Sequence, residues 1–109
     1  MFKERMDLLF QSLEETLITD SLQSYTLEEA LFQASELIDA TDKRGGTIYV
    51  VGNGGSAGIA SHFCNDLMKS LKIAAHSFYD SNLLTCLAND LGYEYVFSFP
   101  LQRVYAWSQ

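Results

Sequence analysis

Apolar residues recur every three or four positions over the first part of the chain, at the spacing of amphipathic helices. One helix is predicted over residues 2–23, ended by Ser24-Tyr25. A second is predicted from Thr26, because Glu29 stands three residues later and completes a capping box. Gly45-Gly46 ends this second helix. The apolar positions are Phe2, Met6, Leu9, Leu13 and Leu17 in the first helix, and Leu27, Ala30, Leu31, Ala34, Leu37 and Ile38, predicted to be buried, in the second.

The pattern changes after the glycine pair. Residues 47–51 are short, β-branched and mostly apolar, which predicts a strand buried on both faces. Pro100 must begin or bend the last predicted helix, because proline cannot donate a backbone hydrogen bond. The other predicted elements are a helix at 57–71 with Ile59, Phe63, Leu67 and Leu71 on one side, a strand at 73–78, a helix from Asp80 or Ser81 to Gly92, and a partly helical segment at 93–107.

This order of elements, two helices followed by alternating strands and helices, indicates an α/β fold with a parallel sheet and right-handed crossovers. Residues 1–45 are expected to form a helical N-terminal arm, and residues 46–109 the beginning of the sheet domain. Two strands are fewer than the four to six or so of a typical sheet. We therefore expect that part of the sheet lies outside this chain.

Composition narrows the classes of partner. The chain of 109 residues has 7 Lys and Arg against 14 Asp and Glu, a net charge of -7. Nucleic acid is bound by clustered cations, so no nucleic-acid partner is expected. A small phosphorylated ligand stays possible, because backbone amides can hold a phosphate. Cys64 and Cys86 form no CxxC motif, so reduced thiols are expected. Neither a signal peptide nor a membrane span is apparent, and we therefore expect a soluble cytoplasmic protein.

The loop Gly52-Asn53-Gly54-Gly55-Ser56 is the strongest candidate binding site. It joins a predicted strand to a predicted helix, at the strand end where α/β folds place ligands. Its glycines remove the Cβ atoms that would keep a ligand from the backbone, and the helix start supplies unpaired N–H groups. Ser56 can act as a helix cap or as a phosphate donor, and Asn53 can meet a sugar hydroxyl. A tight turn without a ligand is the alternative.

Two polar pairs follow the loop. His62 and Asp66 lie four residues apart, so they share a helix face and could bind zinc together or act as an acid–base couple. A surface ion pair is the alternative, and two ligands are too few for a zinc site. Asn89-Asp90 taken alone is read as the last turn of a helix.

Together these residues resemble a known family. The segments Gly52-Asn53-Gly54-Gly55-Ser56-Ala57, His62-Phe63 and Leu87-Ala88-Asn89-Asp90-Leu91-Gly92-Tyr93 are similar to those of phosphoheptose isomerases, members of the sugar isomerase (SIS) superfamily. The similarity extends over essentially the whole chain. It implies a flavodoxin-like α/β sandwich, usually a homotetramer with active sites between subunits. We expect a homo-oligomer, either a tetramer or a dimer.

The resemblance also implies a reaction. Family members convert sedoheptulose 7-phosphate to D-glycero-D-manno-heptose 7-phosphate, which feeds lipopolysaccharide or capsule synthesis. The expected chemistry is an aldose–ketose shift through an enediol, and the family's site contains zinc. By the same resemblance, Asn53, Gly54 and Gly55 match substrate-binding positions with Ser56 beside them, and Asn89 and Asp90 match a substrate-contacting pair.

The metal and catalytic positions match less completely. His62 matches a zinc ligand, and Asp66 stands where the family has a glutamate that is both zinc ligand and catalytic base. Asp66 is one methylene shorter, and a misplacement of about 1 Å can cost ~100-fold in rate. The family's serine- and threonine-rich second phosphate turn and its C-terminal helix have no counterpart here, so the chain looks truncated and is expected to be inactive alone.

Three interpretations stay open at this point. The first is an isomerase of which this chain is the N-terminal half. The second is a non-catalytic SIS module that binds a sugar phosphate or a protein partner, as some relatives do, and the change at Asp66 favours it. The third is an oligomerising half-domain with its long N-terminal helix in a bundle.

Overall fold

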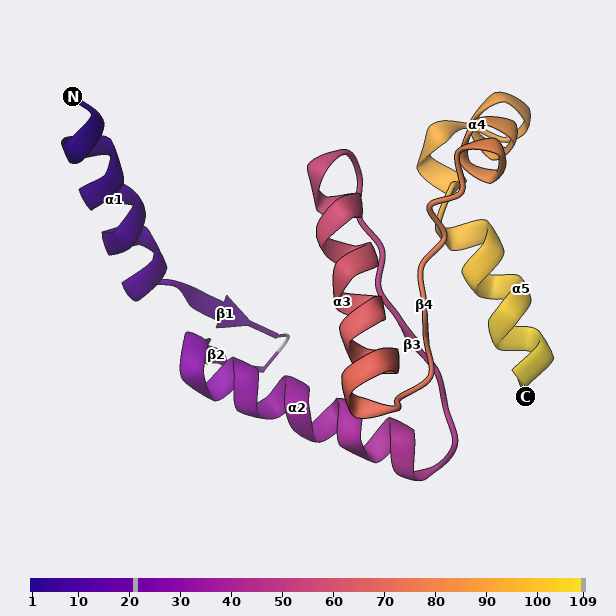
Figure 1. Cartoon of the computed structure of the whole chain (residues 1–109), viewed down its shortest axis with the longest axis horizontal. Coiled ribbons are helices and arrows are strands. Elements are labelled where there is room, and N and C mark those ends of the chain that lie inside the picture. The colour runs from indigo at the N-terminus through magenta and orange to yellow at the C-terminus, as the bar shows by residue number, and fades with distance from the viewer. Residues whose placement is uncertain (21, 109) are drawn as a thin grey trace. The chain divides into compact units, whose positions relative to one another are not determined.

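The computed structural model describes residues 1–20 and 22–108. The chain divides into two compact units, Met1–Arg44 and Gly45–Gln109. The first unit contains helix α1 (Phe2–Glu14), strands β1 (Leu17–Thr19) and β2 (Ser24–Thr26), and helix α2 (Leu27–Lys43). Figure 1 shows each element in chain order, from indigo to yellow.

The first helix is shorter than its apolar pattern predicts. The prediction of one helix over 2–23 is wrong, because α1 ends at Glu14 and an antiparallel hairpin follows, with Ile18 opposite Tyr25. The carboxylate of Asp20 accepts the backbone N–H groups of Leu22 and Gln23 at 2.7 and 2.8 Å. Such a local bond from an aspartate offers the backbone an alternative to the helix. The β-branched residues on either side of the turn then favour strands.

The start of α2 agrees with the sequence. The side chain of Thr26 accepts the backbone N–H of Glu29 at 3.2 Å, and the Glu29 carboxylate accepts the N–H of Thr26 at 3.0 Å. The predicted capping box is therefore confirmed. The prediction that α2 has a buried stripe is wrong within this chain, because none of its residues is buried and Leu37 is 70% exposed. An apolar pattern identifies the helix face that is suited to burial, but burial also requires another element that packs against this face.

The second unit contains every predicted element, with shorter strands. Strand β3 pairs with β4 in parallel, and Ile48 lies opposite Ala75. Figure 1 shows α3 on one side of these two strands and α4 and α5 on the other. The elements are β3 (Ile48–Tyr49), α3 (Gly55–Leu71), β4 (Ala75–His76), α4 (Ser81–Asp90), the 3-10 turn η1 (Tyr93–Tyr95) and α5 (Ser98–Ser108). Pro100 lies in the first turn of α5, where proline is tolerated.

The core of the second unit is built on small residues of α3. The predicted apolar face of this helix is only partly right, since Leu67 is 2% exposed but Ile59 is 74% exposed. The side facing the strands carries Ala60 and Cys64 instead, whose small side chains let the helix approach the sheet. The strand predicted to be buried on both faces is only half-buried. The buried apolar residues are Ala60, Cys64, Leu67, Ile73, Phe78 and Val96.

The ends of the helices position the loops that follow them. Helix α3 closes at Lys72, which has a left-handed φ of 59° and donates its N–H to the carbonyl of Leu67. Gly92 closes α4 with a φ of 114°, a conformation suited to glycine. None of the helices in the described part of the chain combines the length and the apolar character that a membrane crossing requires.

Candidate active site

The glycine loop makes a tight, exposed turn between β3 and α3. Gly54 caps the helix with a φ of 55° and a ψ of -124°, which is costly for residues with a Cβ. A Cβ on Gly52 would lie 2.7 Å from the carbonyl oxygen of Ser56, so only glycine fits there. The N–H of Ser56 donates to the carbonyl of Asn53 at 2.9 Å. Helix α3 begins at Gly55 and has no side-chain cap, so Ser56 does not serve as the cap.

Several amides of this turn make no backbone hydrogen bond. Among the described residues, the structure gives no backbone acceptor to the N–H groups of Asn53, Gly54 and Gly55. Residues 53–56 are exposed, and the turn is not packed shut by the rest of its unit. Gly55 has neither a positive φ nor a neighbour that excludes a Cβ, so this chain gives no steric reason for its being glycine. Free amides at a helix start form an anion-binding arrangement.

The His62–Asp66 pair lies on one face of α3, as its spacing predicts. Nδ1 of His62 is 3.1 Å from Oδ2 of Asp66, and the two side chains are 76% and 54% exposed. An ionised carboxylate can only accept, so Nδ1 is the donor in this contact, and in the neutral form of the ring Nε2 has a free lone pair. A pair of this kind at the surface contributes little to stability. Nε2 is available to a substrate or a metal.

One groove connects the pair with the glycine turn. It has a volume of about 620 Å³ and runs along α3. Because Gly55 lines it together with His62 and Asp66, the groove joins an anion-binding turn to an acid–base pair. Its lining residues are Gly55, Gly58, Ile59, His62, Phe63 and Asp66.

A metal site is only partly supplied by these side chains. The nitrogen of His62 and the oxygen of Asp66 are donors that zinc accepts. Among the described residues, no group of three or more His, Cys, Asp and Glu side chains could hold a metal ion. The donor set therefore fits zinc in kind, and a complete site would need further ligands.

The second predicted pair lies elsewhere. Asn89 and Asp90 form the last turn of α4, both exposed, and the amide of Asn89 donates to Oδ1 of Asp90 at 3.3 Å. Neither residue lines the groove along α3. Within this chain the structure thus brings together the glycine turn, His62 and Asp66, and does not bring this pair to them.

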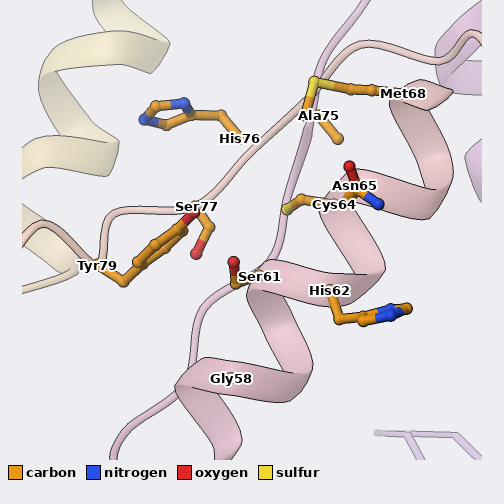
Figure 2. Close-up of a pocket in the computed structure, with 10 residues that line it drawn as sticks. All are labelled: Gly58, Ser61, His62, Cys64, Asn65, Met68, Ala75, His76, Ser77 and Tyr79. Atoms are coloured by element: carbon orange, nitrogen blue, oxygen red, sulfur yellow. The ribbon is translucent and has the colours of Figure 1, made fainter.

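A second groove was not predicted from the sequence. It has a volume of about 570 Å³ and lies between α3 and the segment that begins with β4 (Figure 2). The available signal was the placement of Ser77 directly after β4, because strand ends are where ligands bind in such folds. Its polar lining residues are Ser61, His62, Asn65, His76, Ser77 and Tyr79, and the others are Gly58, Cys64, Met68 and Ala75.

The two cysteines have different surroundings. Cys64 is buried against the sheet and Cys86 on α4 is exposed. Burial raises the pKa of the Cys64 thiol, although a hydrogen bond with the backbone of Val50 acts in the opposite direction. The thiol of Cys64 is therefore an unreactive core group, even though the residue also lines the groove between α3 and β4.

Known proteins with similar sequences match most of this chain. No family model matches the sequence. The chain is 39% identical to a phosphoheptose isomerase of Helicobacter hepaticus over 105 residues, covering 86% of this chain and 53% of the relative. It is 35% identical to one of Edwardsiella ictaluri over 107 residues, covering 90% of this chain and 54% of the relative.

A solved structure with a similar fold comes from the same family as these relatives. The phosphoheptose isomerase GmhA of Neisseria gonorrhoeae superposes with a TM-score of 0.69 at 31% identity, covering 94% of this chain and 54% of that one. This likeness confirms the predicted α/β fold of the SIS type, with its parallel sheet. The chain spans about half the length of the relatives it matches. The resemblance seen in the glycine loop and its neighbours is thus confirmed, and the chain belongs to the phosphoheptose isomerase family.

Proposed function

We propose that the protein carrying this chain is a sugar-phosphate isomerase that converts sedoheptulose 7-phosphate to D-glycero-D-manno-heptose 7-phosphate, for lipopolysaccharide or capsule heptose. The observation that carries the proposal is the single groove in which Gly55 of the amide-bearing turn meets His62 and Asp66. The names of the relatives, phosphoheptose isomerases, support the same reaction. Cytoplasmic location and assembly as a homo-oligomer are part of this proposal.

The turn would hold the charged end of the substrate. The free N–H groups of Asn53, Gly54 and Gly55 can donate to phosphate oxygens, and the start of α3 adds a partial positive charge. The hydroxyl of Ser56 is a further donor, because the helix does not use it as a cap. No lysine or arginine is needed, which agrees with the acidic composition of the chain. Asn89 and Asp90 are proposed as further substrate contacts, by family resemblance.

The acid–base pair would carry the proton transfer. Asp66 as a carboxylate removes a proton from the carbon next to the carbonyl, the C–H electron pair forms the enediol double bond, and the carbonyl oxygen takes up a proton. The other hydroxyl of the enediol then loses its proton and becomes the new carbonyl, while the electron pair of the double bond takes the returned proton onto the neighbouring carbon and completes the shift. His62 orients Asp66 through the contact at 3.1 Å. When bound by His62 and Asp66 with ligands from elsewhere, zinc would supply polarisation of the carbonyl.

A non-catalytic binding module is the second candidate. It is favoured by the length of the Asp66 side chain, which ends one methylene short of the family's glutamate and contacts His62 directly. In such a module the glycine turn would still bind a sugar phosphate, but no proton would be transferred.

Substitutions at Asp66 separate the two candidates. We expect Asp66→Ala to lower the rate of heptose 7-phosphate formation by about 10²–10⁴-fold, the contribution of a positioned base, and to abolish zinc retention. Asp66→Glu restores the longer carboxylate and is expected to retain or raise the rate. Asp42→Ala, an exposed carboxylate on α2, is the matched control and should change neither. A wild-type protein that binds the sugar phosphate without converting it would instead establish the binding module.

A further inference from the structure

The groove between α3 and β4 has the chemistry of a binding site for neutral hydroxyl groups. No lysine, arginine, aspartate or glutamate lines it. Among the described residues, the structure gives no hydrogen-bond partner to the side chains of Ser61, Asn65 and Ser77. Figure 2 shows Ser61 and Ser77 facing each other across the groove, with the ring of Tyr79 beside Ser77. Hydroxyl and amide groups beside an aromatic ring offer donors, acceptors and a contact surface to a sugar.

Within the described part of the chain, the hydroxyl of Ser61 is not used by its own helix, and the same holds for Ser70 further along α3. Helical serine and threonine hydroxyls commonly bond back to the carbonyl four residues earlier. Ser12, Thr41 and Thr85 all do so, at 2.8 Å each. Ser61 makes no such bond within the described residues, so its hydroxyl is left to whatever enters the groove.

Gly58 connects the two grooves. It lines both the groove with the His62–Asp66 pair and the groove between α3 and β4. Glycine within a helix is destabilising relative to alanine. Nothing lies within 4 Å of a Cβ built on Gly58, and its φ is not positive, so neither packing nor backbone conformation in this chain requires glycine. Gly58 and His62 are the residues that line both grooves, so a side chain at position 58 would stand between them.

We propose that the two grooves form one sugar-phosphate site, in which Ser61, Asn65, Ser77 and Tyr79 bind the neutral polyhydroxylated chain and Gly58 keeps the passage between the grooves open. This inference rests on the proposed function, because it assigns the sugar chain of that same substrate. An apolar partner surface fits the groove less well, since most of the lining side chains between α3 and β4 are polar.

The test uses two variants and three probes. Gly58→Ala places a methyl group between the two grooves, and Asn65→Leu removes the amide while keeping the size of the side chain. The probes are sedoheptulose without phosphate, inorganic phosphate, and sedoheptulose 7-phosphate, with binding followed by NMR titration and turnover by product formation. Asn65→Leu is expected to weaken binding of the free heptulose about tenfold, the worth of one or two hydrogen bonds. Gly58→Ala is expected to weaken it by obstruction, and both variants should raise KM for the phosphorylated sugar. Binding of inorganic phosphate should stay unchanged.

The matched control is Ser70→Ala, an exposed position of α3 that lines neither groove. Like Gly58→Ala it raises helix propensity, so both variants should melt at the same or a slightly higher temperature, but only Gly58→Ala should lose heptulose binding. Unchanged heptulose binding in both groove variants would overturn the proposal. Loss of oligomeric assembly in Gly58→Ala would also overturn it, by assigning the passage to a second copy of the chain.

Failure of the proposed function gives a different pattern. A wild-type protein that binds free heptulose, loses this binding in the groove variants and converts no sugar phosphate would refute the isomerase and keep the groove. A wild-type protein that converts sedoheptulose 7-phosphate with a KM insensitive to both variants would keep the isomerase and refute the groove.

Discussion

The two units of the chain are held together in different ways. In the described part of Gly45–Gln109 side chains of α3, of the strand segments and of the C-terminal segment are buried, Pro100 among them, whereas no described residue of Met1–Arg44 is buried. The first unit contains hydrogen bonds between residues close in sequence, namely the capping box at Thr26 and the turn at Asp20. Such a local hydrogen bond contributes about 1 kcal/mol to the free energy of unfolding, while a buried core side chain contributes several kcal/mol. The hairpin and α2 do contact each other in the first unit, but among the described residues only the second unit has buried side chains to stabilise it.

The largest expected effect is at the centre of the second unit. Leu67→Ala should lower the free energy of unfolding by about 2–5 kcal/mol, because it leaves a cavity beneath α3. Leu37→Ala is the same substitution on the exposed side of α2, and should change it by less than about 0.5 kcal/mol. Urea denaturation followed by circular dichroism measures both. Equal losses would mean that α2 is covered by a contact outside this chain.

A smaller effect is expected at the start of α2. Thr26→Ala removes the acceptor for the N–H of Glu29 and should cost about 1 kcal/mol of helix stability. The helical signal of the first unit should fall while the second unit keeps its denaturation midpoint. Thr41→Ala removes a hydroxyl from the same helix without touching the cap, and serves as the control. A first unit insensitive to Thr26→Ala would show that something other than its cap holds α2.

The smallest effect is a local response to acid at the hairpin. The hydrogen bond from the Tyr25 hydroxyl, with those from the backbone of Gln23 and Leu22, holds the pKa of Asp20 below its ordinary value. Because the folded pKa is depressed, the contribution of the carboxylate is complete above the unfolded pKa of about 3.9 and is lost as the pH falls through the folded value. NMR signals of the hairpin should shift below about pH 4. In Asp20→Asn this shift should vanish, and a shift that persists would assign the transition to another group.

Sequence reasoning succeeded where a short segment determines its own structure. The capping box of Thr26, the turn at Gly52–Ser56 and the end of α4 at Gly92 depend on neighbours within a few residues, and each was predicted. It failed at Asp20, because one aspartate that bonds to the backbone outweighs the apolar spacing of residues 2–23.

The buried faces were predicted less well for a different reason. Spacing selects large apolar residues such as Ile59, but a helix that lies close to a sheet needs small ones such as Ala60 and Cys64 on the near side. The groove of Ser61 and Ser77 escaped prediction because these residues meet only after β4 has returned beside β3. Sequence spacing along one helix found His62 and Asp66, but it could not find a site built from two separate segments.

The parallel pairing of β3 with β4 also sets an order of events as the chain is synthesised. Strand β3 and the glycine turn leave the ribosome before β4 does. Ile48 cannot pair with Ala75 until Ala75 has emerged and the whole of α3 has folded between them. Closing this non-local contact costs chain entropy before any ladder bond forms, which makes it slow compared with the folding of a helix. The nascent turn is thus left without its neighbouring strand for the time needed to translate α3.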